Sequence, residues 1–521
     1  MKNILKNTLS VTLVCTVLPV MGALAQPTFH GQVFEPDASE RNYLNQGFEA
    51  YTLFEMDPQE LYSFIDQNRE MAEFSLEVGS FQASIELYEN ELRAPGYVVA
   101  QTGDDGYLEL PIDEACITFA GYLTGSSKDV RLNIQRHRFW GYISTEEGKF
   151  YIEPLNRFIK EFDENFFILY NAAELIQNDE IKCNAEDGDR FKGHHSSFET
   201  PKAGDDCRKL EIATESAYEL YDEGITINDI IGNLNLVESI YMNYFNMKFL
   251  IVYQHEWTTS ADPYTTSSSG CGDFGELDEF AIEWFSNFGN VRRDINVLYT
   301  EKDYSGSTIG CAMTGEFGDG QDNDGTVNNG VVRGAYCVNE WDWDDTSDAE
   351  RQTLVAHEIG HVFGASHDES SNCSNIMCPS LTVSTVFNST SQSQMTADMD
   401  FDVPGIAHPN DGRSAIRERF LPAVSGGAII EFFSAVRSAN VLNLDGNLLQ
   451  MGLFGSINST YRATESIKLG PGFYATAEAG DQVFLQIGSC STAQGLAPET
   501  TSGTDFSGIE QSTFTSMEMA V

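Results

Sequence analysis

The sequence predicts an α/β domain over residues 207–400, preceded by a β-rich segment over 26–206 and followed by a small all-β module over 401–490. Three patterns support this organisation. Strand-like apolar runs alternate with helical apolar spacing between 207 and 400, as in a sheet covered by helices. Short stretches such as 107–112 and 130–134 alternate apolar and polar residues before that domain, and short apolar runs with Gly turns follow it.

The elements of the α/β domain follow from apolar periodicity. Helical spacing appears at 227–244 and 276–288, and a further helix is expected to begin near 348. Near-continuous apolar or alternating runs predict five strands, at 209–214, 247–253, 293–300, 307–317 and 333–341. In the β-rich segment before them, residues 58–70 carry the main helical pattern.

The first 25 residues have the pattern of a secretory signal peptide. Lys2 and Lys6 precede an apolar run over 9–20, and Ala23-Leu24-Ala25 offers a small-residue cleavage site. No later stretch is long and apolar enough to predict a membrane span. We therefore expect a secreted, extracellular protein, with a flexible Ser/Thr-rich tail over 491–521.

Composition limits the possible partners. The formal net charge is −49 and the isoelectric point is near 4.3. Such a surface repels nucleic acid and anionic membranes, so neither is expected as a partner. The sequence leaves the oligomeric state open.

One motif combines several residues of metal chemistry. His357, Glu358, His361, Gly364 and His367 are spaced as H-E-x-x-H-x-x-G-x-x-H. On a helix, the first two histidines share one face, and a left-handed glycine can end the helix so that the third histidine turns back toward them. Three imidazoles leave one coordination position open, as a catalytic zinc site requires. The carboxylate beside the first ligand can act as a general base.

Two local signals support this site. The residues Ser347-Asp348-Ala349-Glu350 form an S-x-x-E capping box, which predicts the start of the histidine-bearing helix. Downstream, the sequence NIMCP at 375–379 contains Met377, the candidate for a methionine turn beneath the metal.

The motif and the methionine turn resemble those of metzincin zinc endopeptidases. Asp368, directly after the third histidine, makes the stretch similar to the reprolysin (adamalysin, ADAM-like) family. The resemblance implies a twisted, mainly parallel sheet of about five strands, with 309–317 as an antiparallel edge strand that pairs with extended substrates. Residues 116–155 resemble a reprolysin pro-domain, which implies that the protein is made as a zymogen.

Nine of the ten cysteines lie beyond the predicted signal peptide. In an exported chain these cysteines are expected to form disulfides. The family resemblance suggests the pairs Cys373–Cys378 and Cys311–Cys337, which leaves Cys207 with Cys271. Cys183 is placed where the family has a cysteine switch, whose thiolate would occupy the open zinc position; a disulfide between Cys183 and Cys116 is the alternative.

An acidic loop raises the question of a second metal. Residues 319–325 have the sequence DGQDNDG, with Asp319, Asp322 and Asp324 as possible Ca²⁺ ligands. The loop lacks the later bidentate Glu of an EF-hand, and acidic turns are common in so acidic a chain. Calcium binding and a solvated turn both remain open at this point.

The function expected from these residues is hydrolysis of peptide bonds in a protein or peptide substrate. His357, His361 and His367 would hold Zn²⁺, and Glu358 would take a proton from the attacking water and deliver it to the leaving amine. The alternative is a non-catalytic secreted surface or adhesion protein that retains a zincin fold.

Overall fold

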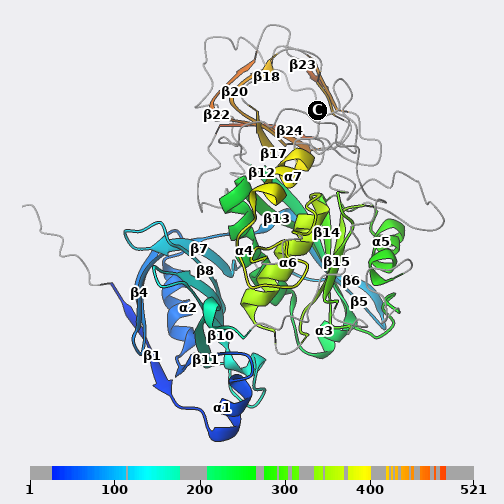
Figure 1. Cartoon of the computed structure of the whole chain (residues 1–521). Coiled ribbons are helices and arrows are strands. Elements are labelled where there is room, and N and C mark those ends of the chain that lie inside the picture. The colour runs from blue at the N-terminus through cyan, green and yellow to red at the C-terminus, as the bar shows by residue number, and fades with distance from the viewer. Residues whose placement is uncertain are drawn as a thin grey trace, which may run out of the picture.

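The computed structural model describes residues 26–112, 115–176, 208–265, 275–289, 291, 293–302, 308–315, 334–343, 346–368 and 373–399, together with strands between 418 and 487 (Figure 1). The predicted signal peptide, the acidic loop at 319–325 and the tail at 491–521 lie outside these residues. The predicted domain boundaries stay predictions.

The N-terminal part is β-rich, as predicted, and nine of its strands close into a barrel. The strand order is β1-β2-β11-β10-β9-β8-β7-β4-β3, and β1 closes the ring by pairing in parallel with β3. Two helices, α1 (Ala38–Leu44) and α2 (Pro58–Gln67), lie between the first strands. The barrel strands are β1 (Thr28–Phe34), β2 (Thr52–Glu55), β3 (Ala72–Val78), β4 (Phe81–Glu89), β7 (Thr118–Leu123), β8 (Asp129–Ile134), β9 (Phe139–Ser144), β10 (Lys149–Pro154) and β11 (Phe166–Asn171).

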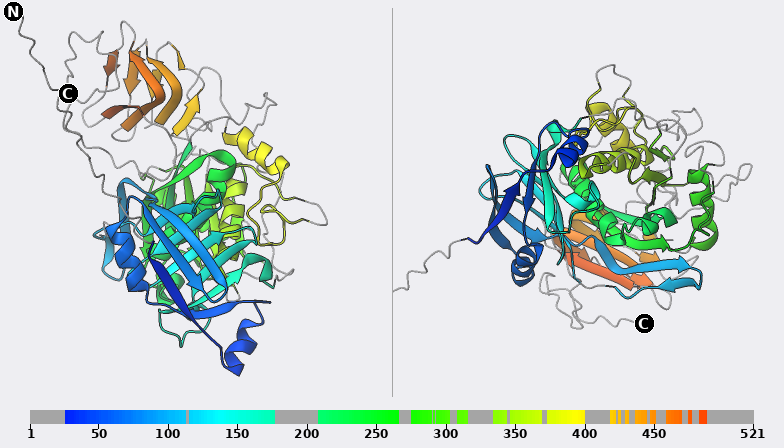
Figure 2. Two further views of the ribbon diagram at one scale, coloured as in Figure 1. Left: turned by 90° about the vertical axis from the view of Figure 1, so that its left-hand side faces the viewer. Right: turned by 90° about the horizontal axis from the view of Figure 1, so that it is seen from below.

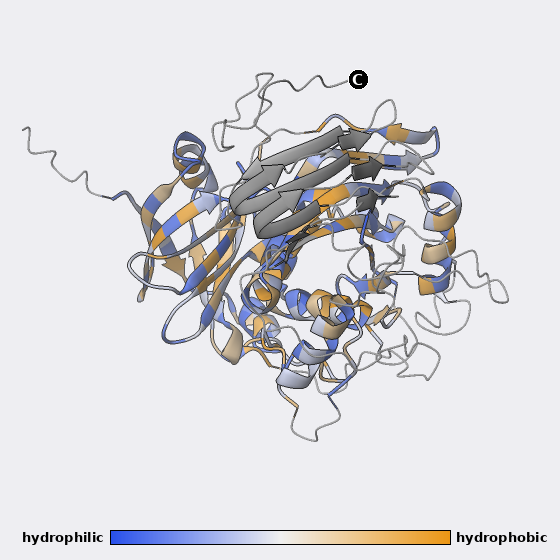
Figure 3. Ribbon diagram, turned by 90° about the horizontal axis from the view of Figure 1, so that it is seen from above, coloured by the Kyte–Doolittle hydropathy of each residue, from blue (hydrophilic) through white to orange (hydrophobic). Residues whose placement is uncertain are grey.

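Alternation along the strands produces the barrel core. Strand β3 alternates buried and partly exposed residues over its whole length, because successive side chains point to opposite faces of a sheet. Figure 3 shows the same alternation of hydrophilic and hydrophobic residues along the barrel strands. Phe54, Phe74 and Phe167 are among the side chains that fill the interior.

A hairpin leaves the barrel between β4 and β7. It consists of β5 (Arg93–Gly103) and β6 (Gly106–Glu109), and β5 pairs in parallel with β13 (Met247–Trp257) of the α/β segment. In the right-hand view of Figure 2 this hairpin lies along the α/β segment and away from the barrel strands. The β-rich segment expected over 26–206 thus contributes two strands to the sheet that follows it.

The α/β segment, residues 208–399, is built on strands β15-β16-β14-β12-β13. The pairs β16–β14, β14–β12 and β12–β13 are parallel, and β15 is antiparallel to β16. The sheet is larger than the five strands that the sequence predicts, because the hairpin extends it beyond β13 and β12 also pairs with a strand beyond residue 417. The strands not yet bounded are β12 (Arg208–Ser216), β14 (Ile295–Thr300), β15 (Gly310–Ala312) and β16 (Tyr336–Glu340).

Helices connect and cover this sheet. Parallel strands of one sheet need long crossovers, which here contain α4 (Ile227–Phe245) between β12 and its neighbour β13, and α5 (Glu276–Asn287) between β13 and β14 on the other side of β12. Helix α6 (Asp348–Val362) packs against α4, and their buried apolar residues share one core with the sheet. The segment also contains α3 (Tyr218–Asp222) and α7 (Ser389–Met399).

Residues beyond 417 contribute only strands to the described structure. Four of them, β17, β20, β22 and β24, are parallel neighbours, and β19, β21 and β23 form a second parallel sheet. Their bounds are β17 (Glu418–Leu421), β18 (Val424–Ser425), β19 (Ile429–Glu431), β20 (Val436–Leu444), β21 (Asn447–Gln450), β22 (Asn458–Leu469), β23 (Tyr474–Thr476) and β24 (Gln482–Ile487). A separate all-β module over 401–490 remains a prediction.

Among the described residues, no helix combines the length and apolar character needed to cross a bilayer.

Candidate metal centre

Helix α6 begins with the predicted capping box. The Ser347 and Glu350 side chains each accept a hydrogen bond from the other residue's backbone N–H, at 3.3 and 2.9 Å. The Ser347 hydroxyl also donates to the Glu350 carboxylate at 2.7 Å. Two of the four N–H groups that a helix start leaves without partners are thereby satisfied. The helix is anchored at its start, nearly three turns before the first histidine.

The three histidines of the motif converge on one point. The Nε2 atoms of His357 and His361 are 2.9 Å apart, and they lie 3.2 and 3.1 Å from Nε2 of His367. His357 and His361 are buried, whereas His367 is partly exposed. Within the described part of the chain, these residues are the one group of His, Cys, Asp or Glu side chains arranged to hold a metal ion.

The Nδ1 atoms of His357 and His361 make hydrogen bonds that direct the Nε2 atoms of these rings to the point where the three histidines meet. Nδ1 of His357 lies 2.6 Å from the Ile376 carbonyl oxygen, and Nδ1 of His361 lies 2.7 Å from that of Ala365. A carbonyl only accepts, so both Nδ1 atoms carry the hydrogen and both Nε2 lone pairs are available to a cation. Burial, and then the charge of neighbouring histidines, lower the pKa of His357 to about 3 and that of His361 well below its ordinary value. The imidazoles are therefore neutral at physiological pH, as metal binding requires.

This donor set fits zinc. In a tetrahedral site with Zn–N distances of ~2.0–2.1 Å, ligand nitrogens lie roughly 3.3 Å from one another. The observed separations of 2.9–3.2 Å are close to that value. The first two imidazoles, with their second nitrogens bound to carbonyls, also match how proteins orient histidine ligands.

Gly364 and Asp368 bring the third histidine into place. Gly364 has φ +81°, a left-handed conformation that a Cβ would strain, and its N–H donates to the His361 carbonyl at 2.7 Å. Four residues later, the Asp368 N–H donates to the Met377 carbonyl, also at 2.7 Å. His367 is thus held between the helix end and the methionine turn.

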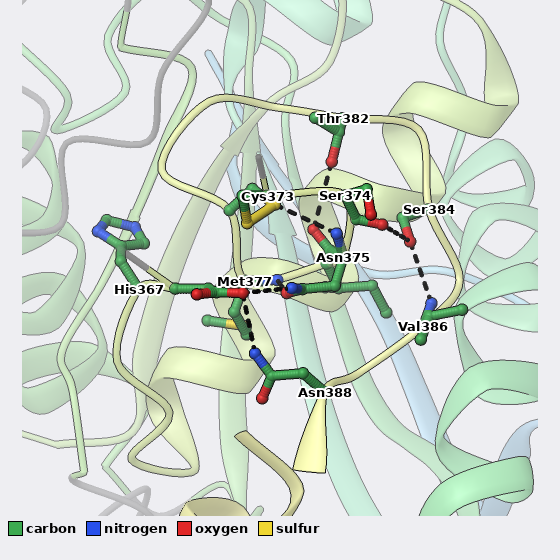
Figure 4. The surroundings of a disulfide bond; sticks show 12 residues. His367, Cys373, Ser374, Asn375, Met377, Thr382, Ser384, Val386 and Asn388 are labelled. Carbon is green, nitrogen blue, oxygen red and sulfur yellow. Dashed lines mark hydrogen bonds between the residues drawn. A yellow bond between two sulfur atoms is a disulfide. The ribbon is translucent and has the colours of Figure 1, made fainter. Parts of the chain in front are cut away.

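The methionine turn lies directly under α6. Met377 is fully buried, and a Cβ built on Gly360 would come within 2.7 Å of its sulfur. Figure 4 shows Met377 beside Asn375 and Asn388, whose side-chain amides donate to the Asp368 carboxylate at 2.6 and 3.1 Å. The predicted disulfide between Cys373 and Cys378 is confirmed and closes this turn. Asp368 therefore ties the third ligand to the methionine turn.

Glu358 lies against the edge strand. A Cβ built on Gly310 of β15 would come within 2.6 Å of Glu358 Oε1, so the glycine leaves the space that the carboxylate occupies. Glu358 is fully buried. The thiol of Cys337 on β16 lies near this carboxylate, and its pKa is raised first by burial and then by the Glu358 charge. The carboxylate is placed between the histidine helix and β15, which ends the sheet order on that side.

One predicted disulfide, Cys311–Cys337, is wrong, and one alternative pairing is excluded. Cys311 is disulfide-bonded, but Cys337 is a free thiol. The register explains this, because Cys311 is opposite Val338 and Cys337 is opposite Ala312, so the two cysteines point to opposite faces of the sheet. Cys116 is also free and buried, with its thiol directed at the Thr118 carbonyl, which excludes the Cys116–Cys183 alternative.

Other predicted site residues lie outside the described residues. These are Cys183, Cys207, Cys271 and the candidate calcium ligands Asp319, Asp322 and Asp324. Nothing in the described structure supports calcium binding.

Sequence reasoning missed several groups that shape the site. The carbonyls of Ile376 and Ala365 carry no sequence signal, since every residue has one. Tyr241 of α4 donates to the Ala356 carbonyl at 2.9 Å, but nothing in the sequence distinguishes this tyrosine from the other aromatic residues. Gly310 did carry a signal, because a glycine inside a strand often marks a close approach of another group.

Comparison with known proteins agrees with this chemistry over part of the chain. Residues 205–401 match the family model described as Metallo-peptidase family M12, which covers less than half of the 521 residues. A search of curated protein sequences found no significant match. Among solved structures, the crystal structure of metalloproteinase-II from Bacteroides fragilis aligns with 66% of this chain and 96% of its own, at 12% identity and a TM-score of 0.39. That score is too low to establish a common fold. The family match, with the three converging histidines, supports a metallopeptidase in residues 205–401.

Proposed function

We propose that the protein is a secreted, reprolysin-like metzincin: a zinc-dependent endopeptidase made as a zymogen. The observation that carries this proposal is the convergence of three imidazole nitrogens beside a buried carboxylate, all within 11 residues of one motif. The match of residues 205–401 to a metallopeptidase family supports it independently.

The histidines have the role of metal ligands. His357, His361 and His367 would hold Zn²⁺ through Nε2, while the Ile376 and Ala365 carbonyls keep the first two rings oriented. When bound, zinc supplies Lewis acidity, which polarises the scissile carbonyl and makes water more acidic.

Glu358 has the role of general base. Its carboxylate follows the first ligand on α6 and lies at the backbone of β15. A peptide beside β15 would place its scissile carbonyl near this carboxylate. Glu358 would accept a proton from the attacking water and donate it to the departing amine.

Strand β15 is the proposed substrate-pairing edge. Among the described strands, β15 pairs with β16 and stands at the end of the sheet order. An extended peptide can add to such an edge through backbone hydrogen bonds. This mode of binding suits a protein or peptide substrate.

The zymogen form rests on the pro-domain resemblance and on Cys183, which remains the candidate latency group. Zinc binds thiolates strongly, so a cysteine in the open position would block the site. If so, Cys183→Ala in the full chain should raise casein cleavage before any processing, whereas Cys116→Ala should not.

A chelation experiment tests the proposed function. Full-length protein, with its linker cleaved, is assayed on casein with and without a strong zinc chelator, and then after stoichiometric zinc is restored. We expect cleavage that chelation abolishes and zinc restores. Absence of chelator-sensitive cleavage, with zinc present at the histidines, would favour the non-catalytic surface or adhesion protein.

A further inference from the structure

We propose that the N-terminal barrel and its hairpin, residues 26–176, form a permanent subunit of the enzyme, which stays bound after the connection to the α/β segment is cut. A pro-segment that dissociates should contact the domain it leaves through a small, polar surface. The described interface is instead extensive and buried, and it combines backbone pairing, apolar packing and buried ion pairs at three places.

The first place is the shared sheet. Strand β5 aligns with β13 over a register that runs from Arg93 opposite Ile251 to Thr102 opposite Trp257. The Ile251 N–H donates to the Leu92 carbonyl at 2.6 Å, just before the first of these pairs. Without β5, the 11-residue strand MKFLIVYQHEW would end the sheet with a long apolar edge, which proteins avoid because it templates aggregation.

The second place is the hydrophobic core. Leu92, Tyr97 and Val99 are buried in the same cluster as residues of α4, β13 and α6. The Tyr97 hydroxyl donates to Gln254 of β13 at 2.6 Å within this cluster. The hairpin therefore supplies part of the interior of the α/β segment, as an obligate interface does.

The third place is a set of buried ionic contacts between the barrel and two helices. Arg131 of β8 donates to Glu238 of α4 at 2.8 Å, and both side chains are almost completely buried. Arg138 donates to Asp229 of α4 at 2.8 Å. Close by, the ring of Trp140 packs on Gly232, where a Cβ would come within 2.5 Å of it.

The same surface reaches the start of α6. Arg157 donates to Asp348 at 2.7 Å, and the Asp348 N–H donates to Glu153 of β10 at 2.9 Å. Tyr151 donates to Gln352 at 2.5 Å. These contacts fall on the first turns of the helix, and the hairpin joins the sheet at the edge opposite β15. The barrel thus supports the metal-binding helix from a side that leaves β15 for substrate.

The proposal is tested by cleaving the chain between the N-terminal part and the α/β segment and measuring whether the two fragments remain associated. A specific protease site is placed between residues 185 and 206 of the full chain, and the cleaved protein is run on native size-exclusion chromatography at decreasing concentration. We expect the two fragments to co-elute in a 1:1 ratio. Fragments that separate at micromolar concentration would overturn the proposal. Co-elution reports association alone, whether or not the protein cleaves peptides.

A matched pair of variants on the hairpin tests the interface itself. Val99→Asp puts a carboxylate into the shared core, and we expect it to weaken association of the cleaved fragments by at least about 100-fold. Leu108→Asp, on the same hairpin but 55% exposed, should change it by less than about threefold. Equal effects of the two would contradict the assigned interface. If Val99→Asp fails to fold, size-exclusion chromatography of the cleaved wild-type chain still shows whether the N-terminal fragment stays bound or is released.

Discussion

Gly310→Ala tests how closely the edge strand and the proposed base are fitted together. The added Cβ would lie 2.6 Å from Glu358 Oε1 and 2.9 Å from Leu354 Cδ1. Ordinary contact begins at 3.4 Å, so the carboxylate or the strand must move by about 0.8 Å (3.4 − 2.6). A displacement of ~1 Å at a reacting group can reduce the rate roughly 100-fold.

We therefore expect Gly310→Ala to lower kcat by roughly 100-fold, with a small change in KM and no loss of zinc. Overpacking should also cost about 1–3 kcal/mol of stability. The assay measures kcat and KM on a quenched peptide, zinc by metal analysis, and Tm. Gly47→Ala is the control, because nothing lies within 4 Å of a Cβ at that position.

A double-mutant cycle distinguishes a positioning effect from general damage. Glu358→Asp shortens the carboxylate arm and should lower kcat by itself. If Gly310 acts through Glu358, adding Gly310→Ala to that variant should cost much less than it does in the wild type. Wild-type kcat in Gly310→Ala, or fully additive losses, would refute the reasoning.

Three further outcomes follow from the buried contacts. Arg157→Ala leaves Asp348 and Asp229 without this cation, so urea unfolding should show a loss of ~3–5 kcal/mol, against at most ~1 kcal/mol for Arg41→Ala at an exposed pair. Burial opposes ionisation of Asp229, but Arg138 and Arg157 outweigh it and lower the pKa of this carboxyl in the folded protein below 3.8. The ionised carboxylate therefore stabilises the fold fully above pH 3.8, and this stabilisation is lost as the pH falls through the pKa of the folded state. Between pH 5 and 2, the free energy of unfolding should fall less in Asp229→Asn than in the wild type. Equal slopes of that free energy against pH in the two proteins would contradict this. Replacing both cysteines of the methionine turn by Ser should cost about 2 kcal/mol for so short a loop, without removing Met377 from beneath α6. A Tm unchanged under oxidising conditions would contradict that estimate.

The parts of the site that depend on local sequence were predictable. The capping box predicts the start of α6, and the helical period places His357 and His361 on one face of that helix. Gly364 adopts the left-handed conformation that the motif requires. Most helices and strands of the α/β segment also begin within a few residues of their predicted bounds, because their apolar runs are long.

The rest depends on register and on distant partners, which periodicity does not contain. The Cys311–Cys337 prediction failed because a shift of one residue between β15 and β16 turns the two side chains to opposite faces. The predicted alternating stretch at 107–112 overlaps β6, but nothing in the sequence indicated strand β5 or its pairing with β13, some 150 residues later. The carbonyls that orient His357 and His361 are backbone groups, which come to these positions only when the chain folds.

The most direct test of the central claim is the behaviour of Glu358→Ala in the full-length, linker-cleaved protein. Zinc content and casein turnover are measured on the same preparation, beside wild type and His361→Ala. We expect Glu358→Ala to keep one zinc per chain and to lose turnover, and His361→Ala to lose both. A Glu358→Ala protein that still cleaves casein at the wild-type rate, in a chelator-sensitive way, would contradict the assignment of Glu358 as the base of a zinc peptidase.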